Sequence, residues 1–138
     1  MVHYQQSLKI QTTGKSLCKI TPKVEALVRE SGITTGVCHL FLRHTSASLM
    51  IQENADPDVL KDLETFFSCL IPEGKSYRHS TEGPDDMPAH IRTALTHTSE
   101  YVPIVQHKLL LGTWQGIYIW EHRQHGSLRE VVVHVTGD

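Results

Sequence analysis

The sequence has little that would place the chain in a membrane or a secretory pathway. No stretch approaches the roughly 18 consecutive apolar residues that a membrane-spanning helix needs. Residues 1–11 mix polar and apolar side chains without a basic start. We therefore expect no membrane partner, no signal peptide and a cytoplasmic location.

Cysteine is also scarce. The three cysteines, Cys18, Cys38 and Cys69, are widely spaced, lie within apolar patterns and form no CxxC pair. This spacing predicts reduced core thiols and argues against both disulfides and a cysteine-based zinc site.

Runs of one charge and the familiar enzyme motifs are missing as well. The formal net charge is -2, with no cluster of Lys and Arg and no acidic tail, which argues against a nucleic-acid partner. No Walker or Rossmann glycine motif occurs, so no nucleotide or other organic cofactor is expected. Because G-x-S-x-G and H-E-x-x-H motifs are absent, the sequence indicates neither a typical α/β hydrolase nor a standard zinc protease.

Histidine, by contrast, is abundant, with 10 residues in a chain of 138. That length suits one domain spanning residues 1–138. Alternating residues predict a strand over 2–12 and a second over 16–20, which we expect to pair as a hairpin. Thr21 before Pro22 predicts the capped start of a helix that Gly32 ends.

A strong strand is expected over residues 36–44, followed by a helix capped by Asp56 before Pro57 and reaching Leu70. A long polar loop over 72–84 precedes a shorter helix beginning at Asp86. The remainder reads as four further strands. About seven or eight strands in a mostly antiparallel or mixed sheet, with three helices, predict an α+β fold.

The first segment with candidate functional residues follows the strand over 36–44. His44 shares the face of Leu40 and Leu42, which places it at the rim of the core. It is either a hydrogen-bonded core histidine or a site residue. The hydroxyl groups of Thr45, Ser46 and Ser48 suit either phosphate oxygens or a turn.

The second segment is the loop and helix start over residues 77–90. If the helix begins near Asp86, His90 lies one turn later on the same side. A carboxylate can then hold one ring N–H while the other nitrogen binds a metal or a proton. A solvated loop with an aspartate cap would explain one carboxylate, but not two histidines in one segment. The candidates here are His79, Glu82, Asp85, Asp86 and His90.

Two further segments flank a late strand. In the first, Trp114 lies between two glycines, where it could stack on a planar ring or simply pack in a turn. In the second, Glu121, His122 and Arg123 end the strand, as at a site mouth or at a transition to the surface. Histidines from several elements could form a zinc-type site, or act as acids and bases without a metal.

Five stretches of the sequence resemble the YjbQ-like family, also described as secondary thiamine-phosphate synthases. They are residues 44–49, 53–57, 82–91, 113–116 and 121–123. The resemblance covers the whole chain and implies a small α+β homotrimer with clefts near the subunit boundaries. It also implies a weak transferase activity that joins a pyrimidine pyrophosphate to a thiazole phosphate.

The resemblance suggests roles for the candidate residues. Arg43, Arg123 and the hydroxyls of Thr45, Ser46 and Ser48 would hold the phosphate of a small ligand. His44, His90, His122 and, with less weight, His79 would bind a divalent metal such as zinc or magnesium, or move protons. Glu82, Asp85 and Asp86 would orient them, and Trp114 with Gln115 would contact the pyrimidine. A metabolite-binding regulatory protein and a metal-dependent hydrolase of small phosphate esters are the alternatives.

Overall fold

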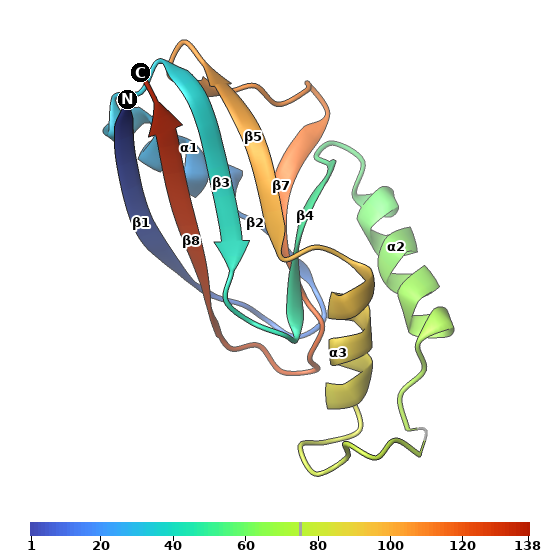
Figure 1. Cartoon of the computed structure of the whole chain (residues 1–138). Coiled ribbons are helices and arrows are strands. Elements are labelled where there is room, and N and C mark those ends of the chain that lie inside the picture. Colours follow the sequence, from blue (N-terminus) through green and yellow to red (C-terminus); the bar gives the residue numbers. More distant parts are fainter. Residues whose placement is uncertain (75) are drawn as a thin grey trace.

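Two antiparallel sheets form the body of the molecule in the computed structural model, which describes residues 1–74 and 76–138 (Figure 1). Their strand orders are β1-β8-β3-β5-β6 and β2-β7-β4. The strands are β1 (Val2–Gln11), β2 (Leu17–Lys19), β3 (Thr35–Leu42), β4 (Ala47–Glu53), β5 (Ser99–Val105), β6 (Lys108–Leu109), β7 (Gln115–Glu121) and β8 (Leu128–Gly137). The helices are α1 (Thr21–Ser31), α2 (Pro57–Leu70) and α3 (Asp86–Leu95). Within the described residues, these eight strands and three helices confirm the predicted α+β fold.

The core lies where alternating side chains of the strands meet. Cys38, Leu40 and Leu42 of β3 are buried, as their spacing predicts. Three alternating valines of β8 and the two isoleucines of β7 join them in one apolar cluster. His44 follows this face of β3 and is half-buried, so its predicted position at the core rim is confirmed.

The predicted hairpin between the first two strands is wrong. β2 pairs with β7 of the other sheet, whereas β1 pairs along its length with β8. The chain crosses over because the backbone N–H groups of Thr12 and Lys15 bond to Ser127 and Arg123 and not back to β1. A Cβ atom at Gly14 would lie 1.7 Å from the Gln124 carbonyl oxygen, so this close crossing requires glycine.

The helix ends match the sequence signals in two of three cases. Asp56 caps α2, since its side chain accepts from the Asp58 N–H at 2.9 Å. Gly32 ends α1 in the left-handed region, with φ of 71°. The predicted Thr21 cap is wrong. Thr21 is the first helical residue, and its hydroxyl accepts from the Ile117 N–H at 2.8 Å, which ties α1 to β7.

Helix α2 is less buried than its sequence pattern suggests. None of its residues is fully buried, and Phe66 is 62% exposed. Phe67 contacts Trp120 of β7 edge to face, with ring centroids 4.9 Å apart. All three cysteines are free. Cys38 is buried as predicted, but Cys69 is exposed, which corrects its predicted core position because α2 covers the sheet with only part of its surface.

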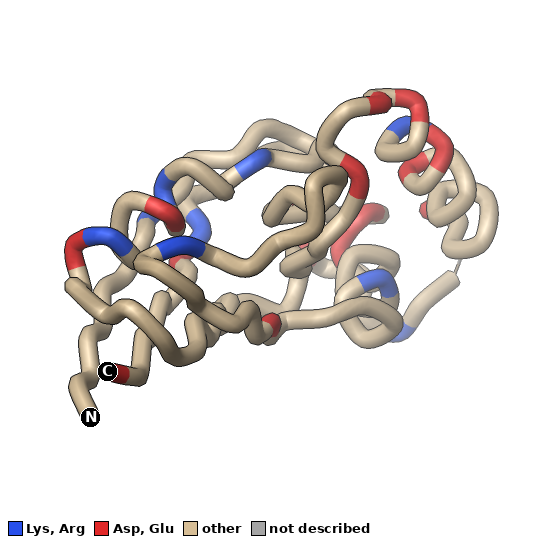
Figure 2. The backbone as a smooth tube through the Cα atoms, turned by 90° about the horizontal axis from the view of Figure 1, so that it is seen from above, with Lys and Arg blue, Asp and Glu red and all other residues tan. Residues whose placement is uncertain are grey.

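The two chain ends lie together at one end of the molecule, and the connection between α2 and α3 lies at the other (Figure 1). Basic and acidic residues are interspersed along the backbone, as the small net charge suggests (Figure 2). None of the helices in the described parts of the chain has the length and apolar character required to cross a bilayer.

Candidate functional site

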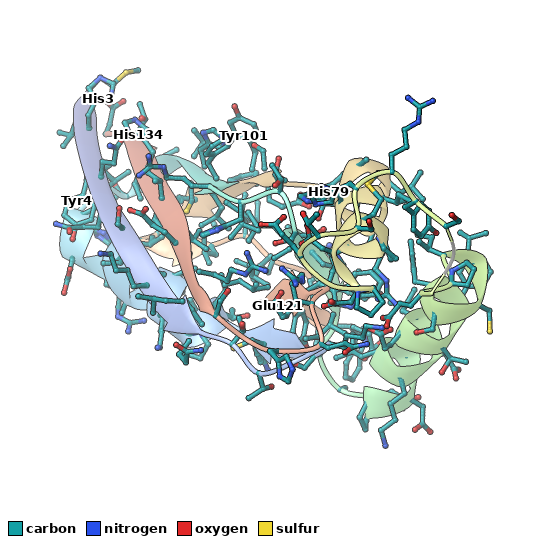
Figure 3. All side chains as sticks on the ribbon, turned by 90° about the horizontal axis from the view of Figure 1, so that it is seen from below. His3, Tyr4, His79, Tyr101, Glu121 and His134 are labelled. Atoms are coloured by element: carbon teal, nitrogen blue, oxygen red, sulfur yellow. The ribbon has the colours of Figure 1, made fainter. Side chains whose placement is uncertain are left out.

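Three candidate ligands converge where the polar loop enters α3. The Nε2 atoms of His79 and His90 lie 2.5 and 3.1 Å from the same oxygen, Oδ2 of Asp86. One ligand atom from each residue lies within 4.8 Å of the other two. His90 sits over Asp86 because the two are four residues apart on α3, the geometry expected from their spacing. His79 lies beside α3, well away from His3 and His134 on the large sheet (Figure 3).

The hydrogen bonds of His90 fix its tautomer. Nδ1 lies 2.9 Å from the carbonyl oxygen of Thr45, which can only accept, so Nδ1 carries the hydrogen. Neutral His90 therefore presents a lone pair on Nε2 to the Asp86 carboxylate, which is another acceptor. The lone pair of Nε2 and the Asp86 oxygen lie 3.1 Å apart, an arrangement in which both atoms could bind one metal ion. A carbonyl that holds the second ring nitrogen is typical of metal-binding histidines.

Asp86 is held in its ionised form although its side chain is only 4% exposed. Burial alone would raise the pKa of this carboxyl. The hydrogen bond from His79 and the positive charge of Arg123, whose Nη1 lies 2.8 Å from Oδ1, outweigh burial and lower the pKa of Asp86. The hydrogen bond to Asp86 in turn raises the pKa of His79. Protons therefore compete with a metal ion for this cluster as the pH falls.

Arg123 joins the polar loop to the end of β7. Its Nε donates to Asp85 Oδ2 at 2.9 Å, and its Nη2 donates to the Glu82 carbonyl oxygen at 2.8 Å. The same Asp85 oxygen accepts from the Gln124 N–H at 2.8 Å. Asp85 occupies the N-cap position of α3, but its side chain makes no cap hydrogen bond, so capping does not account for its carboxylate. Its carboxylate instead positions Arg123 against Asp86.

His44 lines a separate pocket of about 580 Å³ together with Thr45 and Ser46. Its Nε2 accepts from the Glu130 N–H at 2.8 Å. Burial, followed by the charge of Arg129, lowers the pKa of His44, so the ring is neutral. Thr45 belongs to both places: it lines this pocket, and its carbonyl oxygen accepts from His90 of the metal-ligand cluster.

His122 lies inside the protein, with 1% of its surface exposed. Its Nε2 is 2.8 Å from the Ser48 hydroxyl, which also bonds to Thr96. Within residues 1–74 and 76–138, Nδ1 of His122 is buried without a partner. Burial, then the charge of Arg92, lowers the pKa of His122 to about 3. In the described residues, the group with metal-ligand spacing contains neither His122 nor His44.

Sequence comparison matches residues 6–138 to the family described as UPF0047 protein YjbQ-like. The chain belongs to this family. The UPF0047 protein sll1880 of Synechocystis sp. is 62% identical over 98% of this chain and 92% of its own length. The UPF0047 protein YjbQ of Escherichia coli O157:H7 is 38% identical over 98% of this chain and 99% of its own.

A solved structure of a YbjQ-like protein of unknown function from Sulfolobus solfataricus shares the fold. It has a TM-score of 0.91 and 26% identity, and the match covers 99% of both chains. The YjbQ-like family is thus shown over the whole chain, and the names of these relatives assign no activity to it.

A pH-dependent loss of stability follows from the buried His122 of this YjbQ-like protein. In the folded protein His122 stays neutral down to about pH 3. In the unfolded chain it has its ordinary pKa of 6.5 and takes up a proton as the pH falls below 6.5. The stability from neutral His122 is present above pH 6.5 and is lost as the pH falls towards 3, by up to about 4 kcal/mol.

We expect His122→Gln to remove most of this pH dependence of the free energy of unfolding, measured by urea unfolding from pH 7 to 4. His125→Gln, at an exposed histidine nearby, should keep it. A wild-type pH dependence in His122→Gln would contradict the assignment.

Two predicted substrate contacts lie at the far end of β7 from Arg123. Trp114 is 64% exposed, and the Gln115 side chain accepts from the Gly112 N–H at 2.7 Å. Since β7 has seven residues at about 3.3 Å each, its two ends are some 20 Å apart within one chain. The structure therefore does not bring Trp114 and Gln115 to the His79–Asp86–His90 cluster of the same chain.

The sequence pattern did not single out a buried ion pair beneath the site. Arg129 Nε donates to Glu121 Oε1 at 2.8 Å, and Nη2 donates to Oε2 at 2.5 Å. Thr12 donates to Glu121 Oε1 at 2.6 Å, and Arg129 also holds the carbonyl and hydroxyl oxygens of Ser46. The only sequence signal was that Glu121 shares the strand face of the buried Ile119. Nothing local pointed to Thr12, or to Glu121 as the partner of Arg129.

Proposed function

We propose that this YjbQ-like protein is a divalent-metal-dependent enzyme that acts on a small phosphorylated molecule. The specific reaction proposed is the transfer that joins a pyrimidine pyrophosphate to a thiazole phosphate and releases pyrophosphate. One observation carries the metal dependence: two imidazole Nε2 atoms and one carboxylate are gathered around a single point. The family resemblance supports the transfer reaction.

The ligand set of His79, His90 and Asp86 fits a transition ion. Two imidazoles and one carboxylate suit zinc better than magnesium, which prefers oxygen ligands. Three protein ligands also leave a coordination position for a substrate. A divalent ion held there would supply Lewis-acid stabilisation of negative charge on phosphate oxygens.

The chain's own groups prepare this site. The Thr45 carbonyl orients His90 through Nδ1, and Arg123 keeps Asp86 ionised. Glu82 Oε2 lies 3.1 Å from His79 Nε2 and limits the movement of this partly exposed ring. These contacts hold the ligands in place before a metal or substrate arrives, which reduces the ordering that binding requires.

The test is an assay of pyrophosphate release from the two named substrates, with and without a chelator. We expect slow turnover that is lost with the chelator and restored by added zinc. Hydrolysis of generic phosphoesters that is lost with the chelator, without any transfer, would favour the metal-dependent hydrolase instead. The hydrolase is also supported by the 40% exposure of the His79 side chain, which admits water to the site. Tight binding of a phosphorylated ligand without turnover, unchanged by metals, would overturn the proposed enzyme.

We also propose that three copies of the chain associate in the cytosol, as the family resemblance implies. Phe41 and Tyr101 expose apolar surface on the large sheet, which is compatible with contact between copies. The three free cysteines are compatible with a reducing compartment. Light scattering is expected to give three times the mass of one chain, and the mass of a single chain would contradict this.

A further inference from the structure

Thr45, whose carbonyl oxygen holds His90, also lines the 580 Å³ pocket. The pocket lining combines apolar surface, including Phe41 and Leu42, with the polar residues Arg43, His44, Thr45, Ser46, Thr93, Thr98 and Arg129. These residues come from the end of β3, the β3–β4 connection, α3 and the segment after it, and the start of β8. The pocket therefore adjoins the proposed metal centre through Thr45, which holds His90, and through Thr93 on the same helix as His90, yet it contains none of that centre's ligands.

His44 lines this pocket and has one ring nitrogen without a protein partner among the described residues. The Glu130 N–H donates to Nε2, so the hydrogen of the neutral ring must be on Nδ1. No hydrogen bond joins Nδ1 of His44 to any described residue. The one fully buried side-chain polar atom without a partner in these residues is Nδ1 of His122, so Nδ1 of His44 is accessible from outside. The fold thus fixes an N–H of His44 that remains free for a ligand.

Arg129 offers a second fixed donor. The residue is 5% exposed, and its Nε and Nη2 are held by Glu121 and Ser46. Nη1 has no partner among the described residues and is not fully enclosed by protein. Arg129 lines both this pocket and a neighbouring one of about 250 Å³. Because the fork with Glu121 fixes the guanidinium plane, the two N–H groups of Nη1 are positioned before any ligand binds.

Arg43 provides a mobile third donor at the pocket mouth. Its Nη1 bonds to Glu130 at 3.0 Å, and its side chain is 60% exposed. Each arginine already faces a carboxylate on one edge, Glu121 or Glu130, so the pocket carries little net charge. An anion would be held by directed N–H groups more than by long-range attraction.

We propose that this pocket is a subsite for a tetrahedral oxyanion, namely the phosphate group of a small-molecule substrate. The donors are His44 Nδ1–H, Arg129 Nη1 and Arg43, a set that matches phosphate and presents no free carboxylate. The identity of the ligand as a substrate phosphate rests on the proposed function. Binding of phosphate itself needs no metal. Three such bonds predict a dissociation constant for inorganic phosphate on the order of 1 mM.

The test is a titration of the full-length protein with inorganic phosphate, observed through the ¹⁵N resonances of the histidine rings. We expect His44 to show a neutral ring with hydrogen on Nδ1, and its Nδ1 resonance to shift and saturate. The dissociation constant is expected to be the same with EDTA as with zinc. A constant that worsens about tenfold or more with EDTA would mean that phosphate binds the metal, and would overturn the subsite.

Variants separate the pocket from nonspecific binding. Arg43→Gln, at an exposed side chain, should weaken phosphate binding at least about threefold, and His44→Phe about tenfold. His97→Phe is the matched control and should bind as wild type does. An unshifted His44 resonance, or wild-type binding in Arg43→Gln and a folded His44→Phe, would overturn the proposal.

The two proposals fail differently. Phosphate binding at His44 in a protein without turnover would leave the subsite standing and reject the enzyme. Chelator-sensitive turnover with an unresponsive His44 would do the reverse.

Discussion

Replacing His90 with alanine is expected to abolish specific zinc binding and metal-dependent turnover while leaving the fold intact. The substitution removes one of three ligands, so affinity should fall by more than the roughly 10- to 100-fold typical for loss of an outer-shell partner. The ring is half-buried, with 32% of the side chain exposed, so the unfolding midpoint should stay close to that of the wild type. Competition titration with a zinc indicator and urea unfolding measure the two quantities.

His97→Ala is the matched control for this experiment. His97 follows α3, its side chain is 72% exposed, and it pairs with Glu100 outside the cluster. The control should retain wild-type zinc affinity. Unchanged zinc affinity in His90→Ala would remove His90 from the metal centre.

Arg129→Met is expected to be the most destabilising single change near the site. It leaves the fully buried Glu121 carboxylate without its cation, and breaking a buried pair in this way costs about 3–5 kcal/mol in the free energy of unfolding. In the wild type, burial acts to raise the pKa of Glu121. The bonds from Arg129 and Thr12 outweigh it and lower the pKa. Without Arg129 the burial effect prevails, and the pKa of Glu121 should rise.

The loss of stability in Arg129→Met should depend on pH. Stability from the wild-type pair is present above the ordinary pKa of Glu121 and is lost as the pH falls below it. In Arg129→Met the carboxyl protonates at higher pH, so the deficit should shrink as the pH is lowered.

Two variants control for Arg129→Met. Arg43→Met breaks an exposed pair and should change stability by less than about 1 kcal/mol. Glu121→Gln combined with Arg129→Met should recover part of the loss, because no buried charge remains. Equal urea midpoints for Arg129→Met and Arg43→Met would contradict the assigned role of the buried pair.

Local sequence signals predicted the elements well, but the partners of the strands poorly. The alternation along β3 and the Asp56 cap of α2 depend on neighbouring residues, and both are confirmed. The pairing of β2 depends on Gly14 passing the Gln124 backbone, more than 100 residues away in sequence. Thr21 failed as a cap for the same reason, since a distant strand at Ile117 uses its hydroxyl.

In the candidate site, too, the features set by neighbouring residues could be predicted, and those set by the packing of distant elements could not. The Asp86–His90 pair could be predicted because a helix places residues four apart on one side. The separation of His44 and His122 from that pair could not, because it depends on how β3, β7 and α3 pack together. Likewise, Trp114 and Arg123 lie nine residues apart in sequence, but the extended conformation of β7 keeps them apart in space.

The metal content of the purified, tag-free protein, determined by elemental mass spectrometry, tests the proposed centre most directly. The gathered ligands His79, Asp86 and His90 predict close to one zinc or other transition ion per chain, removed by a chelator and regained on adding zinc. A protein that is purified empty and takes up no added ion would contradict the metal centre. The two histidines would then be proton-binding partners of Asp86.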